Sequence, residues 1–410
     1  MEEEEELNFD LPEHIILQIL CRLPVKSLIR FSCVSKRWRS IIISDPQFRK
    51  AHLKLASEQR SITKRLILSV SPSVSIRDHQ SQTRVDQPLR IQSLESLFGD
   101  NSSVTNLTFP SEEHCRINIL GSCNGLVVLG NSYKEWSIWN PSTRFFRKIP
   151  APDFSSVTKK SRIFEPDSYG FGYVSSTDDY KLVFVVHIGG SHYAVSAPDV
   201  KIFIFSVRAN CWKISEVSRW PFLKYKPTSD CGTLSNEAIH WVNQYYVYLQ
   251  DYIEAIDVCA FDLENEEFRK VPIPCFKQDD DRNCDRRMRT VVHSGGCLCV
   301  SSQTIHDRSG DIELWMMRDY GVSNSWAKLY KFSKYDLPVP LTGYYGWDLS
   351  LVTESSGSIV INFENKELLR IECHKEEKPV CVGRYRLEEV SECNFFNATV
   401  YDETLISAPE

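Results

Sequence analysis

The chain has 410 residues, of which 42% are hydrophobic and 25% charged, and its formal net charge is −6. This composition is close to the average of globular proteins, which excludes disorder of the whole chain. The longest apolar run, at residues 182–188, is far shorter than the ~20 residues that span a bilayer, so we expect no membrane partner. The net charge gives no reason to expect nucleic acid as a partner.

The first residues are acidic, with Glu2 to Glu6 following Met1. We expect a disordered acidic tail over residues 1–8. A secretory signal would need a basic start and an apolar run, so we expect a protein of the cytoplasm, the nucleus or both. In a reducing compartment the 14 cysteines should be free thiols. Their spacing contains no pair of motifs suited to zinc, and we expect neither a metal nor a cofactor.

Short helical patterns follow over residues 9–54. Asp10 and Pro12 have the chemistry of a helix start, and Glu13 is placed to close a capping box. Pro24 ends this first helix. The same reasoning predicts a helix over 25–33, a cap at Ser35, a helix over 36–43 and a last turn that begins at Asp45 and Pro46.

About half of the residues in the stretch 11–55 are apolar, which is more than three short helices can bury among themselves. Either these helices pack against the rest of the chain, or they bind a partner. The stretch 22–54 also carries nine basic residues and one acid, Asp45. A nucleic-acid partner is disfavoured for this stretch, because it contains no base-reading motif and its basic residues alternate with apolar ones.

The sequence LPVKSLIRFSCVSKRW at residues 23–38 resembles the F-box motif of plant proteins, and the likeness extends over residues 7–53. The resemblance implies a three-helix hook at residues 9–54. This hook would dock on an acidic Skp-type adaptor, which links to a cullin and a RING protein in a ubiquitin ligase. Nine residues would contact the adaptor, the last two being shared with the core of the hook: Leu11, Pro12, Ile16, Leu20, Leu23, Pro24, Leu28, Val34 and Trp38.

Strand patterns dominate the sequence after a linker that we expect at residues 55–62. A long loop is expected at residues 71–103. A pair of strands then recurs at intervals of about 60 residues. The second strand of each pair carries an aromatic and a basic residue. A weaker fifth copy lies at 357–371. The second aromatic residues are Phe146, Trp212, Phe268 and Trp326.

Repeats of this length fit the blades of a β-propeller better than an irregular two-sheet sandwich, which is the alternative. Closure of a propeller needs a pairing between the two ends of the repeat region. Residues 395–401 and residues 65–70 both have strand patterns, and their pairing would seal the ring.

Five motifs in this region resemble the plant F-box-associated domain of type 1, which is related to kelch proteins. They are GSCNGL at 121–126, WNPSTR at 139–144, YGFGY at 169–173, DYKLV at 179–183 and ELWMM at 313–317. The resemblance implies a substrate-binding domain over residues 63–405. The sequence lacks the regular Gly-Gly doublets of kelch blades, so the number of blades stays open. The fold class expected for the whole chain is α+β, with a small three-helix domain before an all-β, propeller-like domain.

The sequence contains no catalytic or nucleotide-binding motif that we recognise. The carboxylate pair Asp178-Asp179 lies in a polar turn, where a solvated role is more typical than catalysis or metal binding. His240 lies between apolar residues, so we expect it in the core or in a cap. We therefore expect that the protein is not an enzyme.

Together these features predict the substrate-recognition subunit of a Skp–cullin–F-box ubiquitin ligase. The chain would bind the adaptor through its hook and a target protein through its β domain, and ubiquitination would follow from positioning alone. The alternatives are a scaffold that binds the adaptor without ubiquitination, and a propeller lectin or enzyme. No residue identifies the target; the loops where recognition sites tend to lie are 71–103, 151–168, 187–199 and 276–289.

Overall fold

The structure is a computed structural model that describes most of the chain. The described residues are 11–71, 90–94, 104–107, 117–131, 135–154, 166–188, 199–216, 230–247, 253–274, 286–304, 311–337, 349–355, 357–363, 367–373, 379–386 and 395–409.

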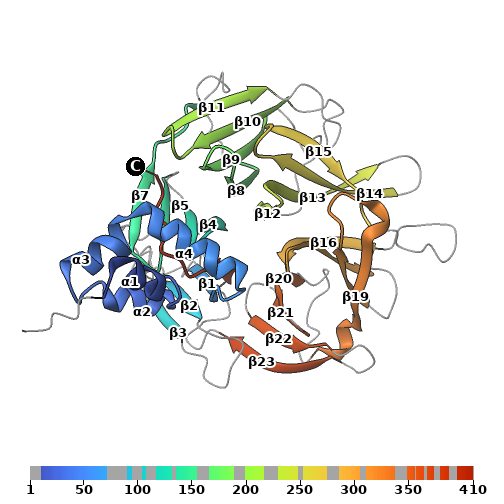
Figure 1. Cartoon of the computed structure of the whole chain (residues 1–410). Coiled ribbons are helices and arrows are strands. Elements are labelled where there is room, and N and C mark those ends of the chain that lie inside the picture. Colours follow the sequence, from blue (N-terminus) through green and yellow to red (C-terminus); the bar gives the residue numbers. More distant parts are fainter. Residues whose placement is uncertain are drawn as a thin grey trace, which may run out of the picture.

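Residues 11–58 form a helical module, which precedes a domain made of strands (Figure 1). Its elements are α1 (Glu13–Leu20), α2 (Val25–Phe31), α3 (Lys36–Arg39), the π-helical turn η1 (Ser40–Ser44) and α4 (Pro46–Glu58). One apolar cluster holds these helices together and also includes Leu405, from the other end of the chain. Its buried members from the module are Leu20, Val25, Leu28, Ile41, Ile42 and Phe48.

The predicted cap at Ser35 is confirmed, and Asp45 caps the helix whose start was predicted there. The Ser35 hydroxyl accepts a hydrogen bond from the backbone N–H of Trp38 at 3.1 Å, at the start of α3. The Asp45 carboxylate accepts one from the backbone N–H of Gln47 at 2.8 Å, at the start of α4. Asp10, predicted to cap α1, lies outside the described residues.

Two boundaries in the module differ from the prediction. The helix expected over 36–43 is α-helical only to Arg39 and then widens into η1, where three consecutive β-branched isoleucines crowd a regular α-helix. Helix α4 continues to Glu58 and so occupies the first half of the linker predicted at 55–62. It continues because Leu55 and Ala56 stay partly buried.

The strands of the described ranges form six four-stranded antiparallel sheets, which are the blades of a propeller (Figure 1). Each blade runs from an innermost strand to an outermost one. Two blades follow each other as β4 (Ile117–Cys123), β5 (Leu126–Asn131), β6 (Trp136–Asn140) and β7 (Phe145–Ile149), then β8 (Ser168–Val174), β9 (Asp179–Ile188), β10 (Asp199–Ser206) and β11 (Cys211–Glu216).

Three further blades complete the run along the chain. They are β12 (Thr233–Ser235), β13 (Ala238–Val247), β14 (Ile253–Asp262) and β15 (Glu267–Val271); β16 (Arg286–Ser294), β17 (Cys297–Thr304), β18 (Asp311–Met317) and β19 (Trp326–Ser333); and β20 (Leu349–Ser355), β21 (Ser358–Phe363), β22 (Glu367–Glu372) and β23 (Val380–Arg386). Two 3-10 turns, η4 (Ser323–Ser325) and η5 (Lys334–Asp336), flank β19.

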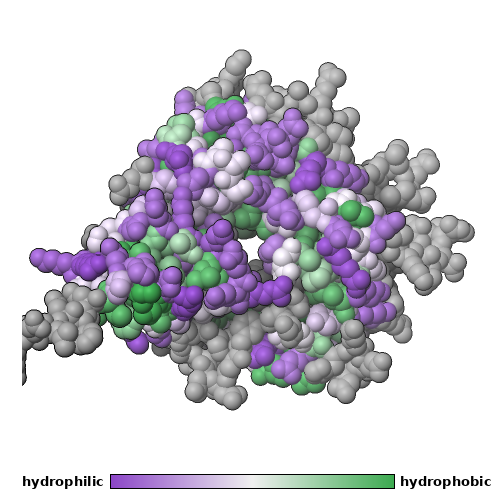
Figure 2. Space-filling view, in the orientation of Figure 1, coloured by the Kyte–Doolittle hydropathy of each residue, from purple (hydrophilic) through white to green (hydrophobic). Residues whose placement is uncertain are grey.

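The remaining blade is built from both ends of the chain. Its innermost strand is β24 (Phe395–Asp402), and β1 (Lys64–Ser71), β2 (Arg90–Leu94) and β3 (Val104–Leu107) follow outward. β1 and β24 pair antiparallel along eight residues each, with Leu66 opposite Val400. The predicted closure of the ring by these two segments is therefore confirmed, and Figure 2 shows a small opening at its centre.

β2 contradicts the long loop predicted at residues 71–103. Its side chains Ile91 and Leu94 are 3% and 1% exposed, and they pack in clusters with residues far away in the sequence. The strand is short and its flanks are polar, so its pairing with β1 and β3 stabilises it more than local preference does.

The recurring aromatic residues lie on the outermost strands and link neighbouring blades. The indole Nε1–H of Trp212 on β11 donates to the carbonyl of Pro150, just after β7, at 2.6 Å. Trp326 on β19 donates in the same way to the carbonyl of Pro272, just after β15, at 2.9 Å. Each tryptophan thus binds the blade that precedes its own.

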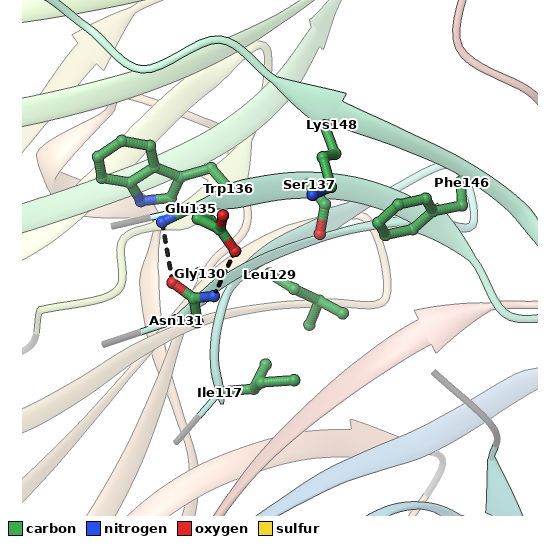
Figure 3. Close-up of a pocket in the computed structure, with 9 residues that line it drawn as sticks. All are labelled: Ile117, Leu129, Gly130, Asn131, Glu135, Trp136, Ser137, Phe146 and Lys148. Atoms are coloured by element: carbon green, nitrogen blue, oxygen red, sulfur yellow. Dashed lines mark hydrogen bonds between the residues drawn. The ribbon is translucent and has the colours of Figure 1, made fainter. Parts of the chain in front are cut away.

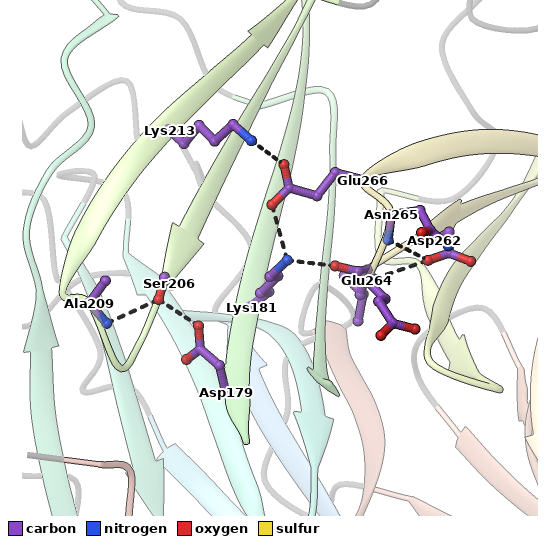
Figure 4. Close-up of polar contacts among 10 residues, drawn as sticks. Asp179, Lys181, Ser206, Ala209, Lys213, Asp262, Glu264, Asn265 and Glu266 are labelled. Atoms are coloured by element: carbon purple, nitrogen blue, oxygen red, sulfur yellow. Dashed lines mark hydrogen bonds and ion pairs between the residues drawn. The ribbon is translucent and has the colours of Figure 1, made fainter. Parts of the chain in front are cut away.

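An ion-pair cluster joins the blade β8–β11 to the blade β12–β15 (Figure 4). Glu266 accepts hydrogen bonds from Lys181 at 3.0 Å and from Lys213 at 2.6 Å. Lys181 also donates to the carbonyl of Leu263 at 2.6 Å. Burial alone would raise the pKa of Glu266, but the hydrogen bonds from the two lysines hold this pKa below its usual value.

The two faces of the ring differ in the length of their connections. On one face, which we call the turn face, tight turns such as Asn124-Gly125 join the first and second strands of the blades. The opposite face, which we call the loop face, carries the strand ends that longer segments join. Among these segments are residues 150–167, 189–198 and 272–285.

The closing blade should dominate the stability of the ring. Phe396 on β24 is 1% exposed and belongs to an apolar cluster with β1, β21 and β22. We expect Phe396→Ala to lower the free energy of unfolding by about 3–5 kcal/mol, because it leaves a cavity at the closure. Urea denaturation measures this loss. The control Val382→Ala, at an exposed position on β23, should stay within about 0.5 kcal/mol of the wild type; equal effects of the two would contradict the prediction.

Candidate functional site

The helical module presents apolar side chains to solvent. Nine large hydrophobic residues are exposed in the part of the chain that the structure describes, and four of them lie on this module: Leu11, Ile19, Phe31 and Val34. Figure 2 shows hydrophobic residues gathered over the module, on the left of the view. Contiguous exposed apolar surface of this kind marks a site of protein binding.

The nine residues predicted to contact the adaptor differ in exposure. Leu20 and Leu28 are 1% and 0% exposed, so in this structure they pack the helices together and have no free surface. The other seven are either packed partly against this core (Ile16, Leu23 and Trp38) or exposed (Leu11, Pro12, Pro24 and Val34). A direct contact with an adaptor stays a prediction for these seven.

Two exposed apolar residues were missed by the prediction. Phe31 lies edge to face against Trp38, with ring centroids 5.6 Å apart, and extends the apolar surface of the module. Ile19 is 48% exposed although its neighbour Leu20 is buried. The apolar residues of α1 cover a wider arc than one packing stripe, and this width was the available signal that some of them would face solvent.

The basic residues of the module divide between two roles. Arg49 donates to the hydroxyl of Ser407, and Lys50 pairs with Asp178 at 2.6 Å, so both bind the rest of the chain. Seven others are exposed on the module: Arg22, Lys26, Arg30, Lys36, Arg37, Arg39 and Lys54. Exposed charges of one sign accelerate the encounter with a partner of the opposite sign more than they strengthen the complex.

The carboxylate pair Asp178-Asp179 has a structural role. Asp178 lies between β8 and β9, where it accepts a hydrogen bond from the Tyr173 hydroxyl at 2.7 Å and pairs with Lys50 and Arg208. Burial alone would raise the pKa of Asp178, but the hydrogen bonds from Lys50 and Tyr173 lower it below the usual value. Asp179 accepts from the backbone N–H of Arg208 at 2.8 Å. Both carboxylates therefore hold the turn face in place.

His240 is a buried packing residue, as the sequence indicated. It is 1% exposed, and its ring nitrogens lie 3.2 Å from the carbonyl of Thr233 and 2.7 Å from the Tyr320 hydroxyl. Arg269 donates to the same hydroxyl at 2.8 Å. Burial lowers the pKa of His240 to about 4, so the ring is neutral at physiological pH.

Within the described ranges, no group of three or more His, Cys, Asp or Glu side chains could hold a metal ion. In the same part of the chain, no helix is long and apolar enough to cross a membrane.

A pocket opens on the loop face of the blade β4–β7 (Figure 3). Leu129 and Trp136 in its lining are buried, whereas Glu135 and Lys148 are exposed. The Asn131 amide donates to the Glu135 carboxylate at 2.9 Å, and the Glu135 backbone N–H donates back at 2.9 Å. The other residues that line the pocket are Ile117, Gly130, Ser137 and Phe146. The lining therefore combines apolar surface with exposed charges of both signs.

Comparison with known proteins agrees with this architecture. The profile of the F-box domain matches residues 9–50, and that of the F-box associated beta propeller domain matches residues 85–406. The chain therefore belongs to the plant family of F-box proteins with an F-box associated β-propeller.

Three relatives from Arabidopsis thaliana illustrate this family. F-box protein At3g07870 is 26% identical over 341 residues, which cover 79% of this chain and 73% of that protein. F-box protein CPR1 is 29% identical over 342 residues, with the same coverage. Putative F-box/kelch-repeat protein At1g13200 is 28% identical over 378 residues, which cover 88% of this chain and 81% of that protein.

The buried His240 should make stability depend on pH. The folded state keeps the ring neutral down to a pKa of about 4, whereas the unfolded chain binds a proton near pH 6.5. Its contribution is therefore fully present above pH 6.5 and is lost as the pH falls toward 4, at a total cost of about 3 kcal/mol. We expect His240→Gln to lose less stability than the wild type between pH 7 and pH 4.5 in urea titrations. Parallel losses in the two proteins would show that His240 does not contribute.

Proposed function

We propose that this protein is the substrate-recognition subunit of a Skp–cullin–F-box ubiquitin ligase. Its helical module binds a Skp-type adaptor, the adaptor connects it to a cullin and a RING protein, and the propeller binds the target. The observation that carries the proposal is the exposed apolar surface of the F-box module, which is attached to a closed propeller. We further propose that the protein acts in the cytoplasm or the nucleus.

The adaptor surface consists of the exposed side chains of the module. Leu11, Val34 and Phe31 supply apolar area, and removing apolar area from water is the main favourable term in most protein association. Arg30 and Lys36 supply positive charge that attracts an acidic adaptor. The buried core beneath keeps these side chains in a fixed arrangement before binding.

The target surface lies on the loop face of the propeller. The module contacts the turn face, as the pair between Lys50 and Asp178 indicates, so the loop face stays accessible while an adaptor is bound. Long connections between rigid strands are where recognition residues concentrate. The pocket with Glu135 and Lys148 opens on this face, so we place a contact with the target there.

Charged substitutions on the module test the adaptor surface. We expect Leu11→Asp and Val34→Asp each to weaken binding of a purified Skp-type adaptor at least about tenfold, because each places a charge in an apolar interface. Isothermal titration calorimetry measures the affinity. Both residues are exposed, so thermal unfolding should stay close to that of the wild type.

Val382→Asp is the matched control, because Val382 is also an exposed valine but lies on β23, outside the module. It should bind the adaptor as the wild type does. Wild-type affinity in Leu11→Asp and Val34→Asp would overturn the adaptor surface, and a wild-type chain that binds no Skp-type adaptor would overturn the proposed function.

A trapping experiment tests the target surface. A chain that carries Leu11→Asp should retain its targets in plant cells, because it no longer connects them to the ligase. We expect the further double change Glu135→Lys and Lys148→Glu to lower the recovery of at least one retained protein about tenfold, since it reverses both charges beside the pocket. Quantitative mass spectrometry compares the two purifications. Charge reversal at the exposed Lys54 of the module is the control. If it lowers the recovery of retained proteins as much as the double change does, the target does not bind at the pocket.

A further inference from the structure

The C-terminal segment 403–409 is buried although it forms neither helix nor strand. Thr404 and Leu405 are each 1% exposed, and Ile406 and Ala408 are 5% and 4% exposed. The ends of a chain are usually poorly ordered unless other parts of the protein hold them. Other parts of the protein must therefore hold this segment in place.

Alternate residues of the segment face two different parts of the molecule, as expected of an extended chain. Leu405 completes the apolar core of the helical module, where it joins Leu20 and Phe48. Ser407 accepts a hydrogen bond from Arg49 on α4. These odd-numbered residues bind the module.

The even-numbered residues bind the propeller. Ile406 and Ala408 belong to the apolar cluster of the blades β4–β7 and β8–β11. The hydroxyl of Thr404 donates to the carbonyl of Asn124 at 2.7 Å. The neighbouring Gly125 has a φ of +83°, and a Cβ there would approach the Thr404 hydroxyl to 2.2 Å. The turn between β4 and β5 is thus shaped to accept the segment.

Asn140 holds the backbone of the segment. Its amide nitrogen donates to the carbonyl of Thr404 at 3.1 Å and to that of Ile406 at 2.8 Å. Its amide oxygen accepts from the backbone N–H of Ser142 at 2.8 Å, which stabilises the turn between β6 and β7. Asn140 is 0% exposed, so none of these groups has access to water as a substitute.

Other blades separate these two roles of Asn140. At the corresponding place, the end of β14, Asp262 accepts from the backbone N–H groups of Glu264 and Asn265 at 3.0 and 2.9 Å. At the end of β10, the Ser206 hydroxyl accepts from the backbone N–H of Ala209 at 3.0 Å. The turn therefore needs only an acceptor, and the two donated hydrogen bonds of Asn140 serve the C-terminal segment alone.

Two further contacts between the module and the propeller are more exposed. The pair of Lys50 and Asp178 is 57% and 36% exposed, and exposed pairs contribute little to stability. Leu53 on α4 packs against the propeller but is only partly buried.

We propose that residues 403–409 are a clamp that fixes the orientation of the adaptor-binding helices relative to the propeller, and that Asn140 is its positioning residue. The clamp deepens the proposed function, because it sets the distance between the adaptor and a target on the loop face. It acts on the orientation of the module, and none of its residues is among the exposed large hydrophobic residues of the adaptor surface.

Asn140→Asp tests the clamp, since it keeps the acceptor for the turn but replaces both donors by an oxygen that faces two carbonyls. The matched control is Asp262→Asn, the reverse change at the corresponding place in a distant blade. In hydrogen–deuterium exchange of the full chain, we expect residues 403–409 to exchange about tenfold faster or more in Asn140→Asp. The control should exchange there as the wild type does.

Small-angle X-ray scattering of the full chain bound to a purified Skp-type adaptor then measures orientation. We expect a larger maximum dimension and several coexisting arrangements for Asn140→Asp, with unchanged adaptor affinity. Leu405→Ala, which weakens the module side of the clamp, should broaden the scattering in the same way.

Two outcomes would overturn the clamp: scattering of Asn140→Asp identical to that of the wild type, or equal changes in Asn140→Asp and Asp262→Asn. A wild-type chain that fails to bind the adaptor would contradict the proposed function only, because exchange and scattering of the free chain still test the clamp.

Discussion

The pairing of β24 with β1 is the constraint on which the rest of the structure depends. It joins residues 64–71 to residues 395–402, so almost the whole chain lies inside the loop that it closes. Closing so long a loop costs conformational entropy before any contact repays it, and folding dominated by such distant contacts is slow. The eight paired residues on each strand and the apolar cluster beneath them offset this cost.

The closure also determines where the adaptor-binding module lies. Helix α4 ends at Glu58, only a few residues before β1, and the chain leaves β24 directly into the segment 403–409. The backbone N–H of Glu403 donates to the carbonyl of Thr63 at 2.8 Å, so the two ends run together away from the closing blade. The same pairing that seals the ring therefore brings Leu405 to the core of the module.

The repeat could be recognised in the sequence because most blades carry the same types of residue at the same positions. Aromatic residues such as Trp212 and Trp326 recur at the positions where they bind the preceding blade. The blade that contains β2 could not be recognised as a repeat from the sequence, because its strands come from both ends of the chain. Only the alternation in 65–70 and 395–401 indicated that these segments pair.

The family motif does not distinguish exposed residues of the module from buried ones, for a physical reason. A motif marks every residue that the function needs, whether that residue touches the partner or holds the helices together. Leu28 is 0% exposed and Val34 is 66% exposed, yet both are apolar residues of one motif. Which of the two is buried depends on how α1, α2 and α4 pack around one core. That core includes Leu405, from the far end of the chain.

Rigid attachment of the module matters because a ligase of this kind would act by positioning. A target lysine reacts when it stays close to the ubiquitin carrier, and each loose joint between them lowers the effective concentration. In this chain two features reduce such flexibility. Helix α4 continues into the predicted linker, and residues 403–409 are mostly buried. The long connections on the loop face can then differ between relatives without changing the distance to the adaptor, because the parts that set this distance lie on the turn face.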